Sequence, residues 1–356
     1  MTRRALSGLV GLLLALGLVA PACSISRGSD VEATSTAEGL LSAALFFTVE
    51  DPSARIQDVP ASSTERRALH VLSDGCRYDD RGIPRCGALL GAAYGSNTDP
   101  LEWERSTLEH PLGVHRTYWA ADDVSRAVEV ARDDLQHDRL PWISFKLPHD
   151  WAQMAAGAGD DWARELASLL AQLDGPVWLA FHHEPEGDPQ GSIKDWTAMQ
   201  ARLAPIVRAT APNVAYSIIV TGYHQLYGEP KYSLSSIWPK DTTVDLVGFD
   251  VYDKYGVEKN GSRFRTPTAF ESAYFSKFRQ FALDHDLAWG LAETGQTDLS
   301  ARRDPLWVQR TFSSMRRYGG VGFVYFDSTL NCAAPWRLKG EKEQRFAGVL
   351  RMTPTL

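Results

Sequence analysis

Short apolar runs recur at regular intervals from Ala88 onward. Each has the length and the β-branched or aromatic content of a buried strand. The runs cover residues 88–94, 113–119, 141–147, 176–183, 214–221, 244–252, 289–293 and 321–326. They predict eight strands with apolar interiors.

Between most of these runs lie segments with the pattern of amphipathic helices. Apolar residues recur at spacings of three and four, and several segments begin with Asp or Ser at an N-cap position. The predicted helices cover residues 122–135, 161–173, 193–209, 270–285, 304–319 and 341–350. The helical signal between the fifth and sixth strands is weaker and is confined to residues 233–239.

The alternation of strands and helices predicts an α/β fold, a (β/α)8 TIM barrel formed by residues 88–356. A doubly wound open sheet is the alternative. That fold commonly carries a glycine-rich phosphate-binding loop after its first strand. No such loop follows residues 88–94, so the barrel is the predicted fold.

Residues 1–22 have the pattern of a secretory signal peptide. Arg3 and Arg4 precede an apolar run that ends near Ala20, and APA then fits a small-x-small cleavage site. The apolar run is shorter than the about 20 residues that a membrane span needs. We therefore expect an extracellular or cell-surface protein.

Three features are predicted between this signal and the barrel. Cys23 directly follows the cleavage pattern, which suggests lipid attachment, as in bacterial lipoproteins, and thus a membrane anchor. Residues 23–39 are polar and small, as in a tether. Residues 40–87 contain the β-like pieces LFFTV and ALHVL, which predict a short extension, either an accessory sheet or a wrap on the barrel.

The charge of the chain narrows the choice of partner. The formal net charge is −7, and without residues 1–22 it becomes −9, because 35 Lys and Arg then face 44 acids. An excess of acids disfavours nucleic acid and anionic membrane surfaces as partners.

The cysteines after Cys23 show no zinc-binding spacing. Cys76 and Cys86 flank a short polar loop and are predicted to form a disulfide in an oxidising compartment. Cys332 is left without an evident partner.

Polar side chains collect where the predicted strands end. In a (β/α)8 barrel the chemistry takes place at the C-terminal ends of the strands. The residues at or near these ends are Tyr94, Arg116, Lys146, His182, His183, Glu184, His224, Asp250, Tyr252, Glu293 and Asp327. Arg116, His224 and Asp250 are predicted to bind substrate, with an ion-pair role as the alternative for Arg116 and Lys146.

Two glutamates lie at the ends of facing strands. Glu184 ends the fourth strand and Glu293 the seventh, three steps apart in a ring of eight. Such a ring has a radius of roughly 7.6 Å, so the two Cα atoms face each other across roughly 14 Å. Side chains that reach about 4 Å inward bring the carboxyls to roughly 5–7 Å, which includes the spacing of retaining glycosidases and touches that of inverting ones.

Three segments resemble glycoside hydrolase family 26 of clan A, which contains β-mannanases with some β-xylanases and β-glucanases. They are FHHEPEGD at 181–188, VGFDVY at 247–252 and LAETG at 291–295, and the resemblance covers about residues 88–350. Its most specific element is a His-Glu pair on the fourth strand with a Glu on the seventh about a hundred residues later.

The resemblance implies a role for each matching residue. Glu184 corresponds to the acid/base, Glu293 to the nucleophile, His183 to the histidine before the acid/base, and Tyr252 to an aromatic near the nucleophile. The chain departs from the family on both sides of Glu184. It has Ala180-Phe181 where mannanases usually carry an Arg nearby, and Pro185-Glu186-Gly187-Asp188 in place of an aromatic cluster. These departures leave the identity of the sugar open.

Other residues near the strand ends keep two interpretations. Glu186 follows Pro185 and is expected to be a solvated loop acid. Strand alternation directs only one of His182 and His183 toward the mouth of the barrel, and only one of Tyr118 and Trp119. Tyr325 and Phe326 are candidate sugar-stacking platforms, with core packing as the alternative.

The predicted function is retaining hydrolysis of a β-linked polysaccharide outside the cell, with no cofactor. Mannan is the first substrate expected, and xylan and β-glucan are the alternatives. One rival is a non-catalytic carbohydrate-binding barrel, which would not need both glutamates. The other is a metal-dependent hydrolase using His182, His183, Glu184 and Asp188. Its ligands would have to converge, which adjacent histidines on a regular strand do not.

Overall fold

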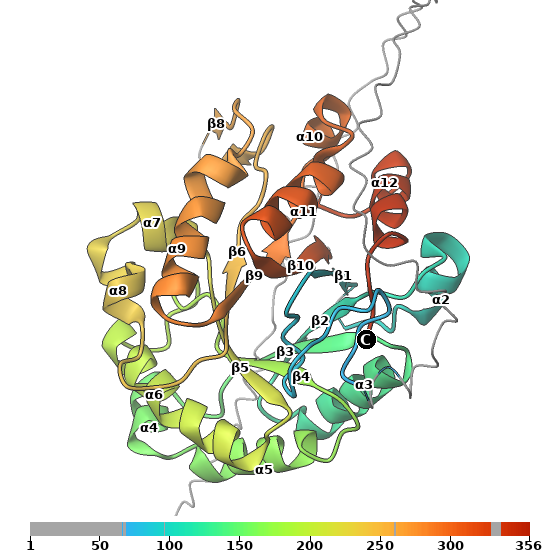
Figure 1. Cartoon of the computed structure of the whole chain (residues 1–356). Coiled ribbons are helices and arrows are strands. Elements are labelled where there is room, and N and C mark those ends of the chain that lie inside the picture. Colours follow the sequence, from blue (N-terminus) through green and yellow to red (C-terminus); the bar gives the residue numbers. More distant parts are fainter. Residues whose placement is uncertain (1–65, 67–68, 96, 260, 329–335) are drawn as a thin grey trace, which may run out of the picture. The chain divides into compact units, whose positions relative to one another are not determined.

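A closed barrel of parallel strands forms the centre of the molecule (Figure 1). The computed structural model describes residues 66, 69–95, 97–259, 261–328 and 336–356. The barrel strands are β1 Leu89–Tyr94, β2 Val114–Trp119, β3 Leu140–Phe145, β4 Val177–Phe181, β5 Val214–Val220, β6 Leu246–Asp250, β9 Ala288–Thr294 and β10 Gly320–Asp327. Their order around the ring is β1-β10-β9-β6-β5-β4-β3-β2.

The pairing of β1 with β10 closes the ring. It runs from Leu89 opposite Gly322 to Tyr94 opposite Asp327, and β1 also pairs with β2 on its other side. The predicted (β/α)8 TIM fold is therefore confirmed, and the open doubly wound sheet is wrong. The fourth strand ends at Phe181, two residues earlier than predicted.

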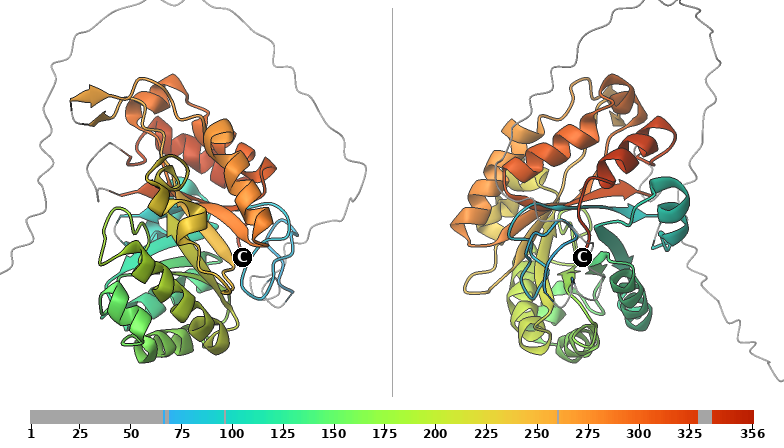
Figure 2. Two further views of the ribbon diagram at one scale, coloured as in Figure 1. Left: turned by 90° about the vertical axis from the view of Figure 1, so that its left-hand side faces the viewer. Right: turned by 45° about the vertical axis from the view of Figure 1, so that its right-hand side comes forward.

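The helices lie outside the strands (Figures 1 and 2). The six predicted helices are confirmed as α3 Val124–Gln136, α5 Asp160–Leu170, α6 Ile193–Thr210, α9 Ser276–Asp284, α11 Trp307–Arg317 and α12 Glu341–Leu350, with α9 continuing the π-helical turn η3 Phe270–Phe275. The weak fifth signal corresponds to short pieces, α7 Tyr223–Tyr227, η2 Pro230–Tyr232 and α8 Leu234–Ile237.

Further short elements decorate the connections. They are α2 Leu101–Trp103, η1 Glu104–Leu108, α4 Trp151–Ala156, α10 Asp298–Arg303, and the strands β7 Glu258–Lys259 and β8 Ser262–Arg263. The two strands pair as an antiparallel hairpin, which projects from the barrel in the left view of Figure 2. Among the described residues, no helix is both long and apolar enough to cross a membrane.

Large indole rings fill the barrel interior. The rings of Trp142 and Trp178 meet edge to face with centroids 4.9 Å apart, and the Trp142 Nε1 donates to Ser217 Oγ at 3.0 Å. A Cβ atom added at Gly248 or Gly322 would lie 2.9 Å from the Trp142 or Trp178 ring, respectively. Glycine on β6 and β10 therefore makes room for tryptophan on β3 and β4, and the barrel is a packed core.

Residues 69–87 cover the N-terminal ends of β3 and β4. A Cβ added at Gly82 would lie 2.6 Å from Leu140 and 2.7 Å from Pro176, and the Arg81 carbonyl accepts a hydrogen bond from Trp178 Nε1 at 3.1 Å. This part of the extension is thus a wrap on the barrel. In ALHVL the described residues 69–72 form no strand, and Val71 makes only an isolated bridge to Arg77. LFFTV lies outside the described residues, as do the signal segment, the tether, Cys23 and Cys332.

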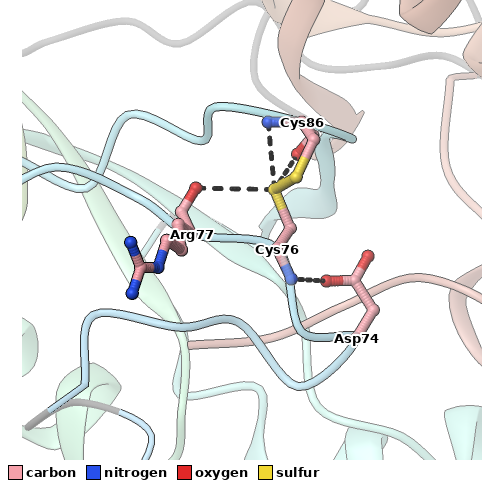
Figure 3. The surroundings of a disulfide bond; sticks show 4 residues. All are labelled: Asp74, Cys76, Arg77 and Cys86. Atoms are coloured by element: carbon pink, nitrogen blue, oxygen red, sulfur yellow. Dashed lines mark hydrogen bonds between the residues drawn. A yellow bond between two sulfur atoms is a disulfide. The ribbon is translucent and has the colours of Figure 1, made fainter. Parts of the chain in front are cut away.

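A disulfide between Cys76 and Cys86 closes a loop in this wrap (Figure 3). The two Cα atoms are 5.6 Å apart, and the half-cystines are separated by 10 positions. The Asp74 carboxylate accepts a hydrogen bond from the Cys76 amide at 3.0 Å, and the Cys86 amide approaches Cys76 Sγ at 3.0 Å. The loop is therefore held by both covalent and polar contacts.

A buried ion network lies on the opposite side of β2 from the barrel interior. The Arg139 guanidinium donates to both oxygens of Glu104 at 2.9 Å and to Asp134 at 2.8 Å, and Asp134 also contacts His115 Nδ1 at 2.8 Å. All four side chains are buried. Their hydrogen bonds offset the cost of removing these charged groups from water. A buried charge without such partners would strongly destabilise the fold.

We expect reduction of Cys76–Cys86 to lower the free energy of unfolding by roughly 2–3 kcal/mol, because the closed loop restricts the unfolded chain. Urea unfolding with and without reductant measures this difference. A Cys76→Ser/Cys86→Ser variant serves as the control and should not respond to reductant. Equal stability of oxidised and reduced wild-type protein would contradict the expectation.

Candidate active site

The backbone turns sharply where β4 meets the mouth of the barrel. The φ angles of His182 and Glu184 are +46° and +50°, in the left-handed region that residues with a side chain rarely adopt. The His182 amide still donates to Phe145 on β3 at 2.9 Å, and the Glu184 amide to Ile219 on β5 at 3.0 Å. The chain therefore stays bonded to both neighbouring strands while its side-chain alternation is interrupted.

This turn decides where the two histidines point. Continued alternation would place His182 on the interior face with Trp178 and Ala180. Instead, the His182 ring packs edge-on against Trp151 of α4, with centroids 5.1 Å apart, and its Nε2 lies 2.9 Å from the Asp188 carbonyl. The His183 ring lies 5.5 Å from that of Tyr118. His183 is thus the histidine on the mouth side.

The surroundings of both histidines favour the neutral imidazole ring. Burial lowers the pKa of His182, and burial with the nearby Arg116 charge lowers that of His183 well below its ordinary value. Among the described residues, no three His, Cys, Asp or Glu side chains converge in a geometry that holds a metal ion. The two histidines of the metal hypothesis point to different neighbours.

Glu293 on β9 is held by two tyrosine hydroxyls. Tyr118, on β2, donates to Oε1 at 2.7 Å, and Tyr252, just after β6, donates to Oε2 at 2.7 Å. Burial, followed by the Glu293 charge, raises the pKa of both tyrosines well above the ordinary value, so each keeps its proton and remains a donor. The two hydrogen bonds therefore fix the orientation of the Glu293 carboxyl group.

Glu184 has a different environment from Glu293. Burial, then the charges of Glu293 and Glu186, raise the pKa of Glu184 to about 8, against the opposing effects of Asp250 and Arg116. Glu184 consequently carries a proton at neutral pH. Its interaction with Glu293 shows that the two carboxyls share one region of the mouth.

Asp250, at the end of β6, faces Glu184. Within the described residues, neither Asp250 oxygen accepts a hydrogen bond from an N–H or hydroxyl group, whereas the Glu184 carboxyl is hydrogen-bonded to it. Two carboxyls can bond only if one holds a proton. Burial, then the charges of Glu293 and Glu184, raise the pKa of Asp250 well above its usual range. Asp250 therefore lies beside Glu184, and its predicted role in substrate binding stays a prediction.

Arg116 lies beneath these acids in the barrel interior. Its side chain is fully buried, its guanidinium carbon is 4.6 Å from the Tyr118 ring centroid, and its charge lowers the pKa of both Glu184 and Asp250. Its predicted contact with substrate is wrong, because no part of the side chain reaches the surface. Arg116 acts on the acids from below.

Glu186 is not the solvated loop acid that was expected. Its Oε1 accepts hydrogen bonds from the Thr221 amide at 2.8 Å, the Thr221 hydroxyl at 2.6 Å and Gln225 Nε2 at 2.9 Å. The same hydroxyl lies 2.8 Å from Nδ1 of His224 on α7. His224 thus lies at the edge of this network, next to the rings of Tyr223 and Tyr232.

The remaining strand-end residues contact other groups of the protein. Tyr325 is fully buried and donates to the Trp336 carbonyl at 3.0 Å, so its role as a sugar platform is wrong. Asp327 is buried and accepts hydrogen bonds from Arg337 and the Leu338 amide.

Lys146 and Tyr94 also contact neighbouring side chains. Lys146 forms an exposed ion pair with Asp188, and Tyr94 stacks on Trp103.

Sequence reasoning left open or missed several contributors to the site. Tyr118 shares the strand face of Arg116, so alternation from that charged residue could have chosen it over Trp119, which packs against Arg126 of α3. Phe326 and Trp336 pack around Tyr252, with ring centroids at 6.2 and 4.7 Å. Trp336 follows no strand, so no periodic signal identified it.

Comparison with known proteins finds similar folds but no similar sequence. No model of a known protein family matches it, and no curated protein sequence matches it either. Among solved structures, a GH26 β-mannanase from Bacteroides ovatus has a TM-score of 0.53 at 15% identity, over 75% of this chain and 89% of that one. At this identity the likeness shows a shared barrel.

Two further structures have similar barrels. An exo-β-1,4-mannosidase from Opitutaceae bacterium strain TAV5 has a TM-score of 0.56 at 12% identity, over 79% of this chain and 62% of that one. Cel5A of Thermotoga maritima, solved in complex with mannotriose, has a TM-score of 0.53 at 11% identity, over 80% of this chain and 99% of that one.

We expect Glu184 to make stability fall as pH rises. Its pKa is raised from 4.5 to about 8 on folding, so its contribution is fully present below about pH 4.5 and is lost as pH rises through about 8. Glu184→Gln mimics the protonated form. The difference in the free energy of unfolding between this variant and wild type should therefore shift in favour of the variant from pH 5 to pH 9. Urea unfolding at both pH values measures the change.

Asp188→Asn is the matched control for this experiment. The hydrogen bond from Lys146 lowers the pKa of Asp188, so its contribution is lost only as pH falls below the tested range. The stability difference between this variant and wild type should be the same at pH 5 and pH 9. A constant difference for Glu184→Gln as well would contradict the assigned environment.

Proposed function

We propose that this protein is a retaining glycoside hydrolase that cleaves β-linked polysaccharide. The observation that supports it is the contrast between two glutamates in one barrel mouth. Glu184 is half-buried and holds a proton at neutral pH, whereas Glu293 has a hydroxyl donor on each oxygen. A proton donor facing a fixed carboxylate is the pairing that glycoside hydrolysis requires.

In the proposed reaction, Glu293 attacks the anomeric carbon. Glu184 gives its proton to the leaving oxygen, so the glycosidic bond breaks as a glycosyl ester forms on Glu293. Glu184, now a carboxylate, then takes a proton from water, which attacks the ester and releases the sugar with retained configuration. The hydroxyls of Tyr118 and Tyr252 keep the nucleophile in line, and no cofactor takes part.

The substrate that we propose first is a mannan. Two of the compared structures are a β-mannanase and an exo-β-1,4-mannosidase, and a third holds mannotriose. Membership of family 26 belongs to the same proposal, which the matching His183-Glu184 pair and Glu293 support. Hydrolysis of mannan, xylan and mixed-linkage glucan by purified protein identifies the sugar.

The two proposed roles predict different behaviour on substitution. Glu293→Ala removes the nucleophile, so activity should fall by roughly 10⁴-fold or more on every substrate. Glu184→Ala removes the acid, yet it should still form the glycosyl-enzyme from a dinitrophenyl β-glycoside, whose leaving group needs no proton. Added azide should then accelerate turnover and give a β-glycosyl azide.

Glu165→Ala, on the exposed face of α5, is the control and should keep wild-type activity. An α-configured azide from Glu184→Ala would overturn retention. If both glutamates are dispensable and a chelator abolishes activity, the metal-dependent alternative replaces this proposal. If the protein binds polysaccharide without cleaving it, the carbohydrate-binding alternative does.

We also propose export followed by lipid attachment at Cys23. The support is the order of charged, apolar and small residues through Ala22, directly before that cysteine. Mass spectrometry of protein recovered from the native host should find residues 1–22 absent, and radiolabelled fatty acid should label wild type but not Cys23→Ser. Recovery of full-length, unlabelled protein would contradict both steps.

A further inference from the structure

Glu186 is anchored more firmly than a loop acid needs to be. The Thr221 amide, the Thr221 hydroxyl and the Gln225 amide group all donate to its Oε1, at 2.6–2.9 Å. These donors come from the end of β5 and from α7, a different wall of the mouth from the loop that carries Glu186. Three donors on one oxygen fix the position of the carboxyl group.

The other oxygen of Glu186 is not used in this way. Oε2 is buried and accepts no hydrogen bond from any group in the described part of the chain. An unsatisfied oxygen on an otherwise fully anchored carboxylate is costly. Its retention calls for a role that depends on the charge of Glu186.

The backbone fixes Glu186 relative to Glu184. Buried Pro185 separates the two, and the Gly187 amide donates to the Glu184 carbonyl at 3.0 Å, which closes a tight turn. The Glu184 amide is in turn bonded to Ile219 on β5, next to the strand end that holds Glu186. These bonds fix the backbone of the two residues, and the donors from Thr221 and Gln225 fix the Glu186 carboxylate.

The groups that act on Glu184 come from every wall of the mouth. Glu293 from β9 and Glu186 from the same loop oppose its ionisation, whereas the hydrogen bond to Asp250 from β6 and the Arg116 charge from β2 favour it. Glu186 also raises the pKa of Asp250. Glu186 is the acid among these that is anchored by three donors on one oxygen.

We propose that Glu186 is a positioning residue for the acid/base: a fixed negative charge that keeps the proton on Glu184 and so sets the upper pH limit of catalysis. This inference rests on the proposed function of Glu184. The inference assigns a role to Pro185-Glu186, which occupy the position of the aromatic cluster in the resembled family.

Thr221 and His224 complete the anchor. The Thr221 hydroxyl has a single proton, which goes to the Glu186 carboxylate at 2.6 Å, so toward His224 Nδ1, at 2.8 Å, it acts as acceptor. His224 therefore carries a proton on Nδ1. Loss of the Thr221 hydroxyl should loosen Glu186 while leaving every charge in place.

The test is the pH dependence of kcat/KM for Glu186→Gln, an isosteric change that removes the charge. The alkaline limb of the profile should move to lower pH by about one unit, because an opposing charge next to Glu184 is gone. The rate on the acidic side should change little. Thr221→Val should move the limb in the same direction by a smaller amount.

Asp188→Asn is the matched control, since it removes a negative charge from the same loop where that charge is half exposed and paired with Lys146. Its profile should stay within a few tenths of a unit of wild type, because water screens the lost charge. An unshifted limb in Glu186→Gln, or equal shifts in Glu186→Gln and Asp188→Asn, would overturn the inference. So would a uniform loss of rate at all pH values, which is the mark of a merely structural role.

A direct titration separates this inference from the proposed function. The infrared band of the protonated Glu184 carboxyl, assigned by its loss in Glu184→Gln, should titrate at lower pH in Glu186→Gln than in wild type. If that shift occurs in a protein that hydrolyses no β-glycan, the electrostatic link stands and the proposed function fails. If wild type hydrolyses its substrate and the band does not shift, the inference alone fails.

Discussion

The closed ring of parallel strand pairs, in which β10 pairs with β1, is the constraint on which the site depends. It holds the ends of β2, β4, β6 and β9 on one ring, so that residues far apart in sequence meet at its mouth. Tyr118 and Glu293, for example, are 175 positions apart and hydrogen-bonded at 2.7 Å. The indole rings of Trp142 and Trp178 fill the space below. The acids therefore lie above a packed interior, where charges interact more strongly than in water.

Within this mouth, similar carboxyl side chains have different environments. Glu184, Asp250 and Glu293 all lie near Arg116, but the protein distributes donors among them unequally. Glu293 receives two hydroxyl donors, whereas Asp250 receives none from the described N–H and hydroxyl groups and turns to Glu184. The result is that the pKa of Glu184 is raised to about 8, whereas the Glu293 carboxyl is held in place by a hydroxyl donor on each oxygen. Neither state is a property of the residue type alone.

The strands and the main helices were readable from the sequence because each depends on local periodicity and composition. The fourth strand was read two residues too long, since the apolar pattern contains no sign of the left-handed turn at His182. Arg116 was misplaced because a strand pattern does not give the depth of a side chain. Tyr325 was misplaced because its ring faces the helices, where it packs against Trp307 and Phe346. The anchoring of Glu186 could not be read at all. Its donors lie 35 and 39 positions away, on a strand end and a short helix whose approach depends on the whole ring.

The left-handed backbone at His182 and Glu184 has a consequence for how such a protein changes over time. Each of these conformations costs roughly 1 kcal/mol or more for a residue with a side chain, and glycine or asparagine would tolerate it better. Burying Glu184 among other acids adds to that cost. If Glu184 is the proposed acid/base, a population of variants selected for thermal endurance alone would accumulate replacements at position 184 early and lose turnover. Persistence of glutamate at that position in a natural lineage would be the signature of selection for activity.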